Sequence, residues 1–454
     1  MSAAAPGKGR RGAIARNGLL MATAQYLCVG IGFGTAVAAA RLLGADGYGR
    51  AALVLAFPSL VWSFVSLKPG TAVTRYLAIA RAGGRHAEAA AVCRLGFGID
   101  LATSLLALLL AGVTSAWVAA RVYHLPGTGW LMVAYGASFP FLSLMGTSTA
   151  VLNTWLRFRA LAGVQLFERL VTLVLVVGAL AWRPGVGAFV LATAAAQVLT
   201  GAASLWSAHR VLAGAGLPGW WRRGEPLPAA LRREIFSFFG WNYLLVSLAG
   251  AVAQLPLMLL GRFRGPAEAG FYRLALTLVT AGSYLENALA RVVYPLLCAR
   301  WAEAERRPLG RELRQWTLRL GVPAAAGLVA GTLFLPWLVP LVFGPQFAGA
   351  ARGVQWMMVG TVVGTVFFWQ SSYFQAAGKM SVLTRANAAY SAVIVALVAL
   401  LAGPWGFAGA AVVIGLARAG YSAVLLAAMP RGAAPRGSGA APAVRLPGAV
   451  EAAT

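Results

Sequence analysis

Long apolar segments alternate with short polar ones along nearly the whole chain. Each apolar segment is long enough to cross a bilayer as a helix, which takes roughly 20 residues. Prolines such as Pro58 and Pro256 lie inside these segments, where neighbouring helices can satisfy the freed backbone groups. The strict alternation of outer-membrane barrel strands is missing from the sequence. The pattern predicts an all-α membrane protein with twelve transmembrane helices, at about 18–40, 49–67, 92–118, 130–153, 161–182, 186–208, 236–260, 270–298, 317–343, 350–376, 382–402 and 406–429.

A polar turn after the first predicted helix recurs half a chain later. The stretch ARLLGADGYG at 40–49 and the stretch GRFRGPAEAG at 261–270 share an arginine and two glycines at an offset of 221 residues. The same offset brings Gly185 onto Gly406 near the other end of each half. The repeat predicts two six-helix halves around a central cavity, and because six is an even number, the halves are parallel repeats related by an axis along the membrane normal. Duplication retained only for structure is the alternative.

The composition and the charge pattern agree with a membrane protein. Charged residues make up 11% of the chain and hydrophobic residues 59%, whereas a soluble domain carries about 25% charged residues. The net charge of +26 is concentrated at the N-terminus, in alternate loops and in the C-terminal tail. This asymmetry predicts cytoplasmic termini and basic loops beside anionic lipid headgroups. A nucleic-acid partner is not expected.

The remaining features divide the chain without adding a catalytic motif. Cys28, Cys93 and Cys298 have no metal-ligand spacing, and no catalytic triad, metal cluster or phosphate loop is present. We therefore predict neither catalytic residues nor a metal site. The predicted organisation is a cytoplasmic arm at 1–17, an N-terminal half at 18–210, a basic cytoplasmic linker at 211–234, a C-terminal half at 235–429 and a disordered cytoplasmic tail at 430–454.

Polar side chains inside the predicted helices are the candidate functional groups, since such residues usually face a bundle interior or an aqueous cavity. On the segment 270–298, polar residues recur every three or four positions and form one helix face, at Thr277, Thr280, Tyr284, Asn287 and Arg291. This face predicts a substrate site that uses Arg291, Asn287 and Tyr284. Snorkelling side chains and internal ion pairs are the alternative explanation.

Further charged residues lie in or beside other predicted helices. The cations Lys68, Arg75 and Arg94 are additional substrate-binding candidates. Asp100 and Glu286 are the candidate carboxylates for ion coupling, because each lies inside a predicted helix. Glu168, Arg169 and Arg273 also lie inside predicted helices, and the sequence assigns them no role.

Two stretches resemble a known family. The opening phrase with Arg41, Gly44, Asp46, Tyr48 and Gly49 is similar to the first two helices of bacterial oligosaccharide-lipid flippases. These flippases are the polysaccharide-transporter branch of the multidrug/oligosaccharidyl-lipid/polysaccharide exporter superfamily. The stretch 374–413, with its Ala-Gly-Lys turn and the Gly-x-x-Gly-Ala-Ala that starts at Gly406, resembles the family's last two helices. Lys68-Pro69-Gly70 departs from the plain glycine-rich turn that is common there, which leaves the role of Lys68 open.

The resemblance implies a transporter that moves a polyprenyl-diphosphate-linked sugar from the inner to the outer leaflet of a bacterial cytoplasmic membrane by alternating access. It implies a role in cell-surface polysaccharide synthesis, with membrane lipids, a polymerase and glycosyltransferases as partners. No cofactor is expected, and H⁺ and Na⁺ both remain candidate coupling ions. Arginine suits a diphosphate because its planar, permanently charged group matches phosphate oxygens. We further expect an outer gate or hinge at Arg41, Gly44, Gly49, Arg262, Gly265 and Gly270.

Three other functions fit the sequence less well. A cation-coupled drug antiporter of the same superfamily would bind its cargo through acids such as Asp100 and Glu286, but acids are fewer than cations inside the predicted helices. A membrane enzyme would need a large outer loop that carries catalytic groups. A purely structural membrane scaffold is the third, and glycosyltransferase genes beside this one would favour the flippase over it. The sequence does not name the sugar.

Overall fold

The computed structural model describes residues 8–217, 219–222, 227–302 and 309–429, and no strand occurs in these ranges. The π-helices are η1 (Val118–Val122) and η2 (Thr317–Gly321), and η3 (Pro345–Ala350) is a 3₁₀ helix. The α-helices are α1 (Lys8–Val65), α2 (Gly70–Ala82), α3 (His86–Trp117), α4 (Gly129–Gly136), α5 (Phe139–Thr154), α6 (Phe158–Trp182), α7 (Val186–Gly214), α8 (Ala229–Arg264), α9 (Pro266–Ala302), α10 (Gly310–Trp316), α11 (Val322–Leu333), α12 (Leu335–Phe343), α13 (Ala351–Val366), α14 (Gln370–Ala376) and α15 (Met380–Ala427).

The predicted apolar segments are helical, but two pairs of them run together. Helix α1 breaks at Gly44 (φ 72°, ψ 177°) and α15 breaks at Gly406 (φ 55°, ψ −145°), so each contains two predicted helices. By length and composition, six helices of the described chain could cross a membrane. A seventh is added if the pair Gly310–Leu333 and Leu335–Phe343, bent by 64°, counts as one. The count of twelve crossings stays a prediction.

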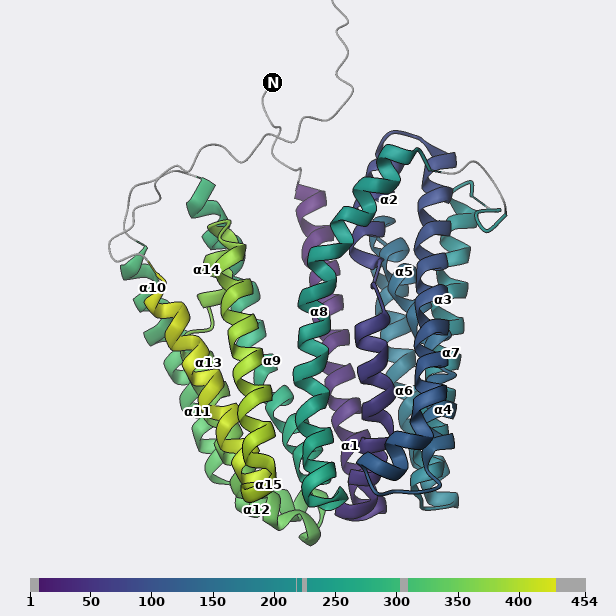
Figure 1. Ribbon diagram of the computed structural model, residues 1–454. Helices are drawn as coiled ribbons and strands as arrows, with labels where there is room; N and C mark the ends of the chain where they lie inside the picture. Colours follow the sequence, from purple (N-terminus) through teal and green to yellow (C-terminus); the bar gives the residue numbers. More distant parts are fainter. Residues whose placement is uncertain (1–7, 218, 223–226, 303–308, 430–454) are drawn as a thin grey trace, which may run out of the picture.

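The helices form two bundles, as the repeat predicts (Figure 1). Helices α1–α7 make the N-terminal half and α8–α15 make the C-terminal half, in which α8 lies beside α1. The halves meet at the end where α12 lies and diverge toward the end where α1 begins. We call the first of these ends the hinge end, because Arg41, three residues before the break at Gly44, donates there to a carbonyl oxygen of α12.

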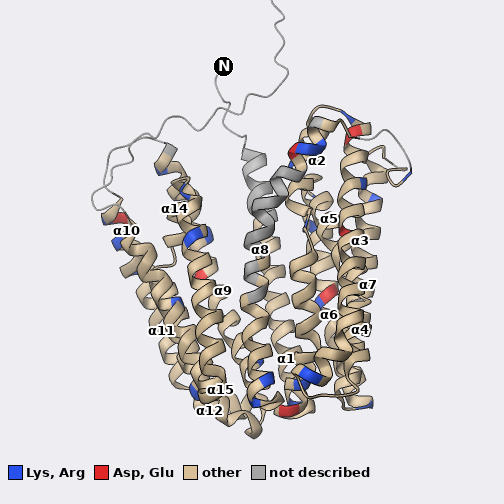
Figure 2. Cartoon of the chain, viewed as in Figure 1, with Lys and Arg blue, Asp and Glu red and all other residues tan. Residues whose placement is uncertain are grey.

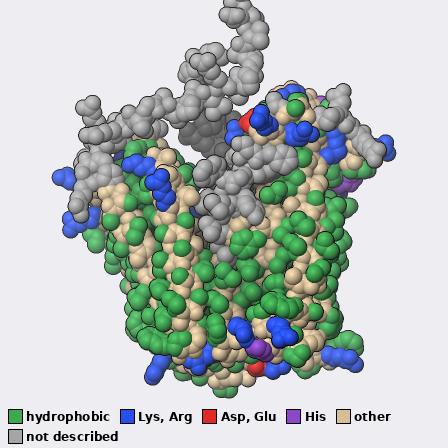
Figure 3. Space-filling model, in the orientation of Figure 1, with side chains coloured by type: hydrophobic (Ala, Val, Ile, Leu, Met, Phe, Trp, Pro, Cys, Tyr) green, Lys and Arg blue, Asp and Glu red, His purple; other side chains and the backbone are tan. Residues whose placement is uncertain are grey.

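Side-chain chemistry follows the long axis of the molecule. Lys and Arg gather near the two ends and are sparse between them (Figure 2). A broad hydrophobic band covers the middle of the visible face (Figure 3). Large apolar side chains are exposed along it, for example Val113 (76%), Val174 (66%) and Leu333 (69%). A soluble protein rarely exposes an apolar surface of this extent, whereas lipid tails would cover it in a bilayer. The chain is therefore a multi-pass membrane protein.

The short helix α2 is not among the predicted segments. Its buried face, with Val73, Tyr76 and Leu77, packs on α3 and α5. Leu217 and Trp220, from the predicted linker, are buried in the same cluster. Of the predicted arm, residues 8–17 belong to α1, and residues 1–7 and the predicted tail at 430–454 lie outside the described part of the chain.

Candidate functional site

A cavity of about 620 Å³ lies between the two halves. Helices α1, α6 and α7 of the N-terminal half and α9 of the C-terminal half supply most of its lining. Its volume is in the range of small-molecule binding sites. The cavity therefore occupies the place where the repeat predicts a substrate.

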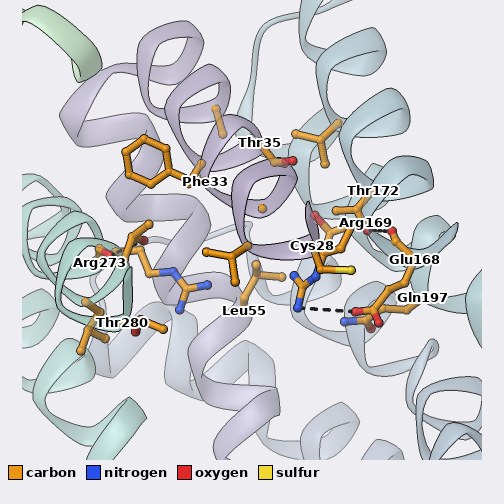
Figure 4. A pocket seen from close by; sticks show the side chains of 18 of the residues that line it. Cys28, Phe33, Thr35, Leu55, Glu168, Arg169, Thr172, Gln197, Arg273 and Thr280 are labelled. Carbon is orange, nitrogen blue, oxygen red and sulfur yellow. Dashed lines mark hydrogen bonds and ion pairs between the residues drawn. The ribbon is translucent and has the colours of Figure 1, made fainter. Parts of the chain in front are cut away.

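Two arginines point into this cavity from opposite halves (Figure 4). Arg169 comes from α6 and Arg273 comes from α9. Among the described residues, the one ion-pair partner of Arg169 is its sequence neighbour Glu168, with 4.0 Å between Nη2 and Oε1, and the Arg169 side chain is 46% exposed. The Arg273 side chain is exposed and has no hydrogen bond or ion pair to any described residue. Glu168 is the single carboxylate of the lining, so the charged groups there sum to +1 (two Arg, one Glu).

Neutral polar groups make up the rest of the polar lining. Several threonine hydroxyls donate to the carbonyl four residues earlier on their own helix, among them Thr35, Thr172, Thr193, Thr200 and Thr277. A hydroxyl that donates in this way keeps lone pairs free to accept. The cavity therefore offers acceptors as well as the donors of the arginines.

The predicted polar face of α9 lies partly on this cavity. Thr277, Thr280 and Tyr284 line it, whereas Asn287 and Arg291 are exposed outside the lining. The predicted substrate role of Tyr284, Asn287 and Arg291 remains a prediction.

The other predicted cations lie away from the cavity, toward the end opposite the hinge. The ammonium group of Lys68, a residue with φ 47°, lies 5.2 Å from the ring centre of Trp62. Arg75 Nη2 lies 3.9 Å from Glu234 Oε1, and Arg94 donates to the Trp220 carbonyl at 3.3 Å. The two arginines thus contact α8 and the segment before it.

The two predicted coupling carboxylates differ in their surroundings. Asp100 is 2% exposed, and its Oδ2 accepts from the Thr147 hydroxyl at 2.6 Å and the Thr147 amide at 3.3 Å. It has no ion pair with a described residue. Glu286 Oε2 forms an ion pair with Arg418 Nη2 at 2.7 Å. Neither carboxylate lines the cavity. Glu286 has a cationic partner, whereas Asp100 has none among the described residues.

The predicted hinge glycines lie where the halves touch. Gly44 and Gly265 have nearly the same conformation (φ 72°, ψ 177° and φ 91°, ψ 179°), which non-glycine residues rarely adopt. A Cβ on Gly49 would lie 1.7 Å from the Pro266 carbonyl oxygen and 2.8 Å from the Gly270 nitrogen. The equivalent glycines of the two halves therefore pack backbone against backbone.

Two equivalent arginines bridge the halves at the same end. Arg41 donates to the carbonyl oxygen of Val342 at 2.7 Å and also to that of Leu341, at the end of α12. Arg262 contacts His124, which follows η1 in the N-terminal half. Each arginine thus reaches from its own half to the other.

The sequence reading left Arg169 and Arg273 unassigned. Arg273 lies four residues before Thr277, so extending the polar face of α9 by one turn would have included it. Arg169 has no comparable signal, because its position in the cavity depends on how α6 packs.

The comparisons with known proteins agree with this architecture. The sequence profile of a family described as "Polysaccharide biosynthesis protein" matches residues 14–300. No curated protein matches the sequence. Solved structures similar in fold include the lipid II flippase MurJ in an inward closed conformation (TM-score 0.69, 12% identity, 90% of this chain and 87% of that one). Others are an inward-facing multidrug resistance MATE family transporter of the MOP superfamily (0.67, 13%, 87% and 92%) and a MOP superfamily transporter from Pyrococcus furiosus (0.60, 13%, 90% and 93%).

Proposed function

Because the chain belongs to the family of polysaccharide biosynthesis proteins, we propose that it is a flippase for a polyprenyl-diphosphate-linked oligosaccharide. It moves this lipid from the inner to the outer leaflet of a bacterial cytoplasmic membrane by alternating access, with both termini in the cytoplasm. The glycan then enters cell-surface polysaccharide synthesis, where glycosyltransferases supply the cargo and a polymerase consumes it.

The observation that carries this proposal is the pair of arginines that face one cavity from opposite halves. A diphosphate is a compact anion, and guanidinium groups bind phosphate oxygens through charge-assisted, often bidentate hydrogen bonds. Arg169 and Arg273 can hold it from both sides, while the lipid tail stays in the bilayer. A cargo held by both halves is sensitive to their relative position, which alternating access requires.

The shape of the molecule supports loading from the cytoplasm. The halves meet at the hinge end and diverge toward the end where α1 begins (Figure 1). With a cytoplasmic N-terminus, the closed end faces outward, and the cavity receives cargo from the inner leaflet.

A cation-coupled antiporter of the same superfamily is the second candidate. Glu168 in the lining favours it, as does Asp100, which has no ion pair with a described residue, because such a transporter binds cationic cargo and protons through carboxylates. The net charge of +1 in the lining opposes it.

The test is ligand binding by purified protein in lipid nanodiscs. We expect Arg169→Gln and Arg273→Gln each to weaken binding of a polyprenyl-diphosphate-linked sugar by roughly tenfold or more, because each removes a charge-assisted contact of about 1.5–3 kcal/mol. Arg183→Gln is the matched control, because Arg183 stacks on Trp182 outside the cavity. Undiminished binding by both cavity variants, or tighter binding of a lipophilic cation than of the diphosphate lipid, would contradict the proposal.

A further inference from the structure

A hydrogen-bonded group of neutral side chains forms part of the cavity wall in the N-terminal half. Gln197 of α7 donates through Nε2 to the Tyr135 hydroxyl at 3.2 Å and accepts at Oε1 from the Ser138 hydroxyl at 2.5 Å. Ser59 Oγ of α1 lies 3.4 Å from the same Tyr135 hydroxyl oxygen. The Tyr135 ring packs edge-on against Phe139, with 5.3 Å between ring centres. Four contacts thus fix the positions of Tyr135 and Gln197, both of which line the cavity.

This group keeps hydrogen-bonding capacity for a ligand. The Tyr135 hydroxyl accepts from Gln197 Nε2, and either hydroxyl can donate in its 3.4 Å contact with Ser59. The amide nitrogen of Gln197 carries two hydrogens and uses one of them in this network. Gln197 therefore keeps one N–H for a molecule in the cavity, and the Tyr135 hydroxyl can rotate to donate to such a molecule.

Acceptors follow on the same face of α7. Thr193, Gln197 and Thr200 are spaced by four and three residues, and all three line the cavity. The Thr193 hydroxyl donates at 2.7 Å to the carbonyl four residues earlier, so its lone pairs remain to accept, whereas the Thr200 side chain is fully buried. We call Tyr135, Thr193 and Gln197 the α7 wall. It presents donors and acceptors side by side and contains no charged group.

We propose that the α7 wall binds the sugar that is attached to the diphosphate. Sugar hydroxyls donate and accept at once, so they match a surface that does both, whereas a diphosphate only accepts. Figure 4 shows Gln197 on the same side of the cavity as Glu168 and Arg169, and opposite Arg273. A diphosphate held by the arginines therefore places its first sugar against this wall. This inference rests on the proposed flippase function and adds the part of the cavity that selects the glycan.

The α7 wall also accounts for selectivity between glycans. If a sugar lacks one hydroxyl or carries it in the inverted configuration, a polar atom of the wall loses its hydrogen-bond partner and stays buried without one. The resulting loss of affinity discriminates against the wrong sugar more strongly than shape alone. Tyr135 is 7% exposed, so its hydroxyl has little access to water once a ligand fills the cavity.

The experiment compares two ligands on each variant: polyprenyl diphosphate, and the same lipid carrying one sugar. The sugar is the one that wild-type protein binds best among a panel of hexoses and N-acetylhexosamines. We expect Gln197→Leu, Tyr135→Phe and Thr193→Val each to weaken binding of the sugar-bearing lipid by about 3- to 10-fold, since each removes a neutral hydrogen bond. Binding of the bare diphosphate should not change.

Two controls separate this inference from the function on which it rests. Arg273→Gln should weaken binding of both ligands by the same factor. If it changes the binding of neither ligand, the proposed diphosphate site is refuted, whatever the results for the wall variants. Thr103→Val is the matched control for Thr193→Val, because its hydroxyl also donates to its own helix at 2.7 Å but lies outside the cavity lining. The inference is overturned if no sugar in the panel binds more tightly than the bare diphosphate. Equal weakening of both ligands by the three wall variants would overturn it as well.

Discussion

Replacing Gly49 with alanine should separate the two halves at the hinge end. The new Cβ would lie 1.7 Å from the Pro266 carbonyl oxygen, 2.6 Å from its carbonyl carbon and 2.8 Å from the Gly270 nitrogen. All three are backbone atoms, so no side chain can rotate away to make room. The contact in this structure has to open before the methyl group fits.

The size of the effect follows from this overlap. Inserting a methyl group into a closely packed site costs about 1–3 kcal/mol. That cost falls on the state in which the halves touch, so its population relative to an opened state should drop by about 5- to 150-fold. Gly34→Ala is the matched control on the same helix, because no heavy atom outside its own helix lies within 4 Å of the new Cβ.

The assay is a distance measurement between spin labels at Trp182 and Trp405, which are 81% and 63% exposed. The native cysteines Cys28, Cys93 and Cys298 are replaced first. By the alternation of helix directions, both labels lie at the hinge end, one in each half. We expect a longer mean distance for Gly49→Ala and an unchanged one for Gly34→Ala. Equal distance distributions in the two variants would refute the role of Gly49 as an inter-half contact.

Three further predictions concern charged residues within the helices. Glu286→Gln should lower the thermal unfolding temperature in detergent by leaving Arg418 without its carboxylate partner, a loss of about 1 kcal/mol for a partly exposed pair, and Arg418→Leu in the same chain should restore most of it; no recovery would exclude a simple ion pair. Asp100→Asn should remove the dependence of transport on an ion gradient while substrate binding persists, because this buried carboxylate lacks an ion-pair partner; gradient-dependent transport by the variant would exclude it. Arg291→Ala should insert normally yet abolish glycan export in a strain that depends on this protein, with Arg291→Lys partly active, and wild-type export at normal immunoblot levels would show that Arg291 has no substrate role.

Hydropathy and the internal repeat were sufficient to predict most of the architecture. An apolar run of about 20 residues has few alternatives to a membrane helix, so the predicted segments are helical in the structure. The 221-residue offset relates equivalent positions, and it pointed to Gly49 and Gly270. That these two glycines touch each other depends on how the halves pack, which no local pattern encodes.

The miss at α2 has a different physical cause. Its 13 residues are too few to span a bilayer, so a search for long apolar runs passes over them. Its helical form depends on burying Val73 and Tyr76 against α3, together with Trp220 from a distant segment.

The cavity residues were only partly predictable. Thr277 and Tyr284 belong to a periodic polar face that the sequence reveals directly. Arg169 and Gln197 face the cavity because of the rotation of α6 and α7 about their axes, and this is set by packing with other helices. Arg273 lies one turn before this face, and only the structure places it on the cavity.

The most direct test of the account is transport of a polyprenyl-diphosphate-linked sugar in proteoliposomes that contain the purified protein. Sugar that reaches the opposite leaflet is detected by an added enzyme that cannot cross the bilayer. We predict protein-dependent movement of the sugar lipid by the wild type, and background movement by the Arg169→Gln/Arg273→Gln variant reconstituted at the same level. Background movement by the wild type with every sugar of the panel, or wild-type movement by the double variant, would contradict the account.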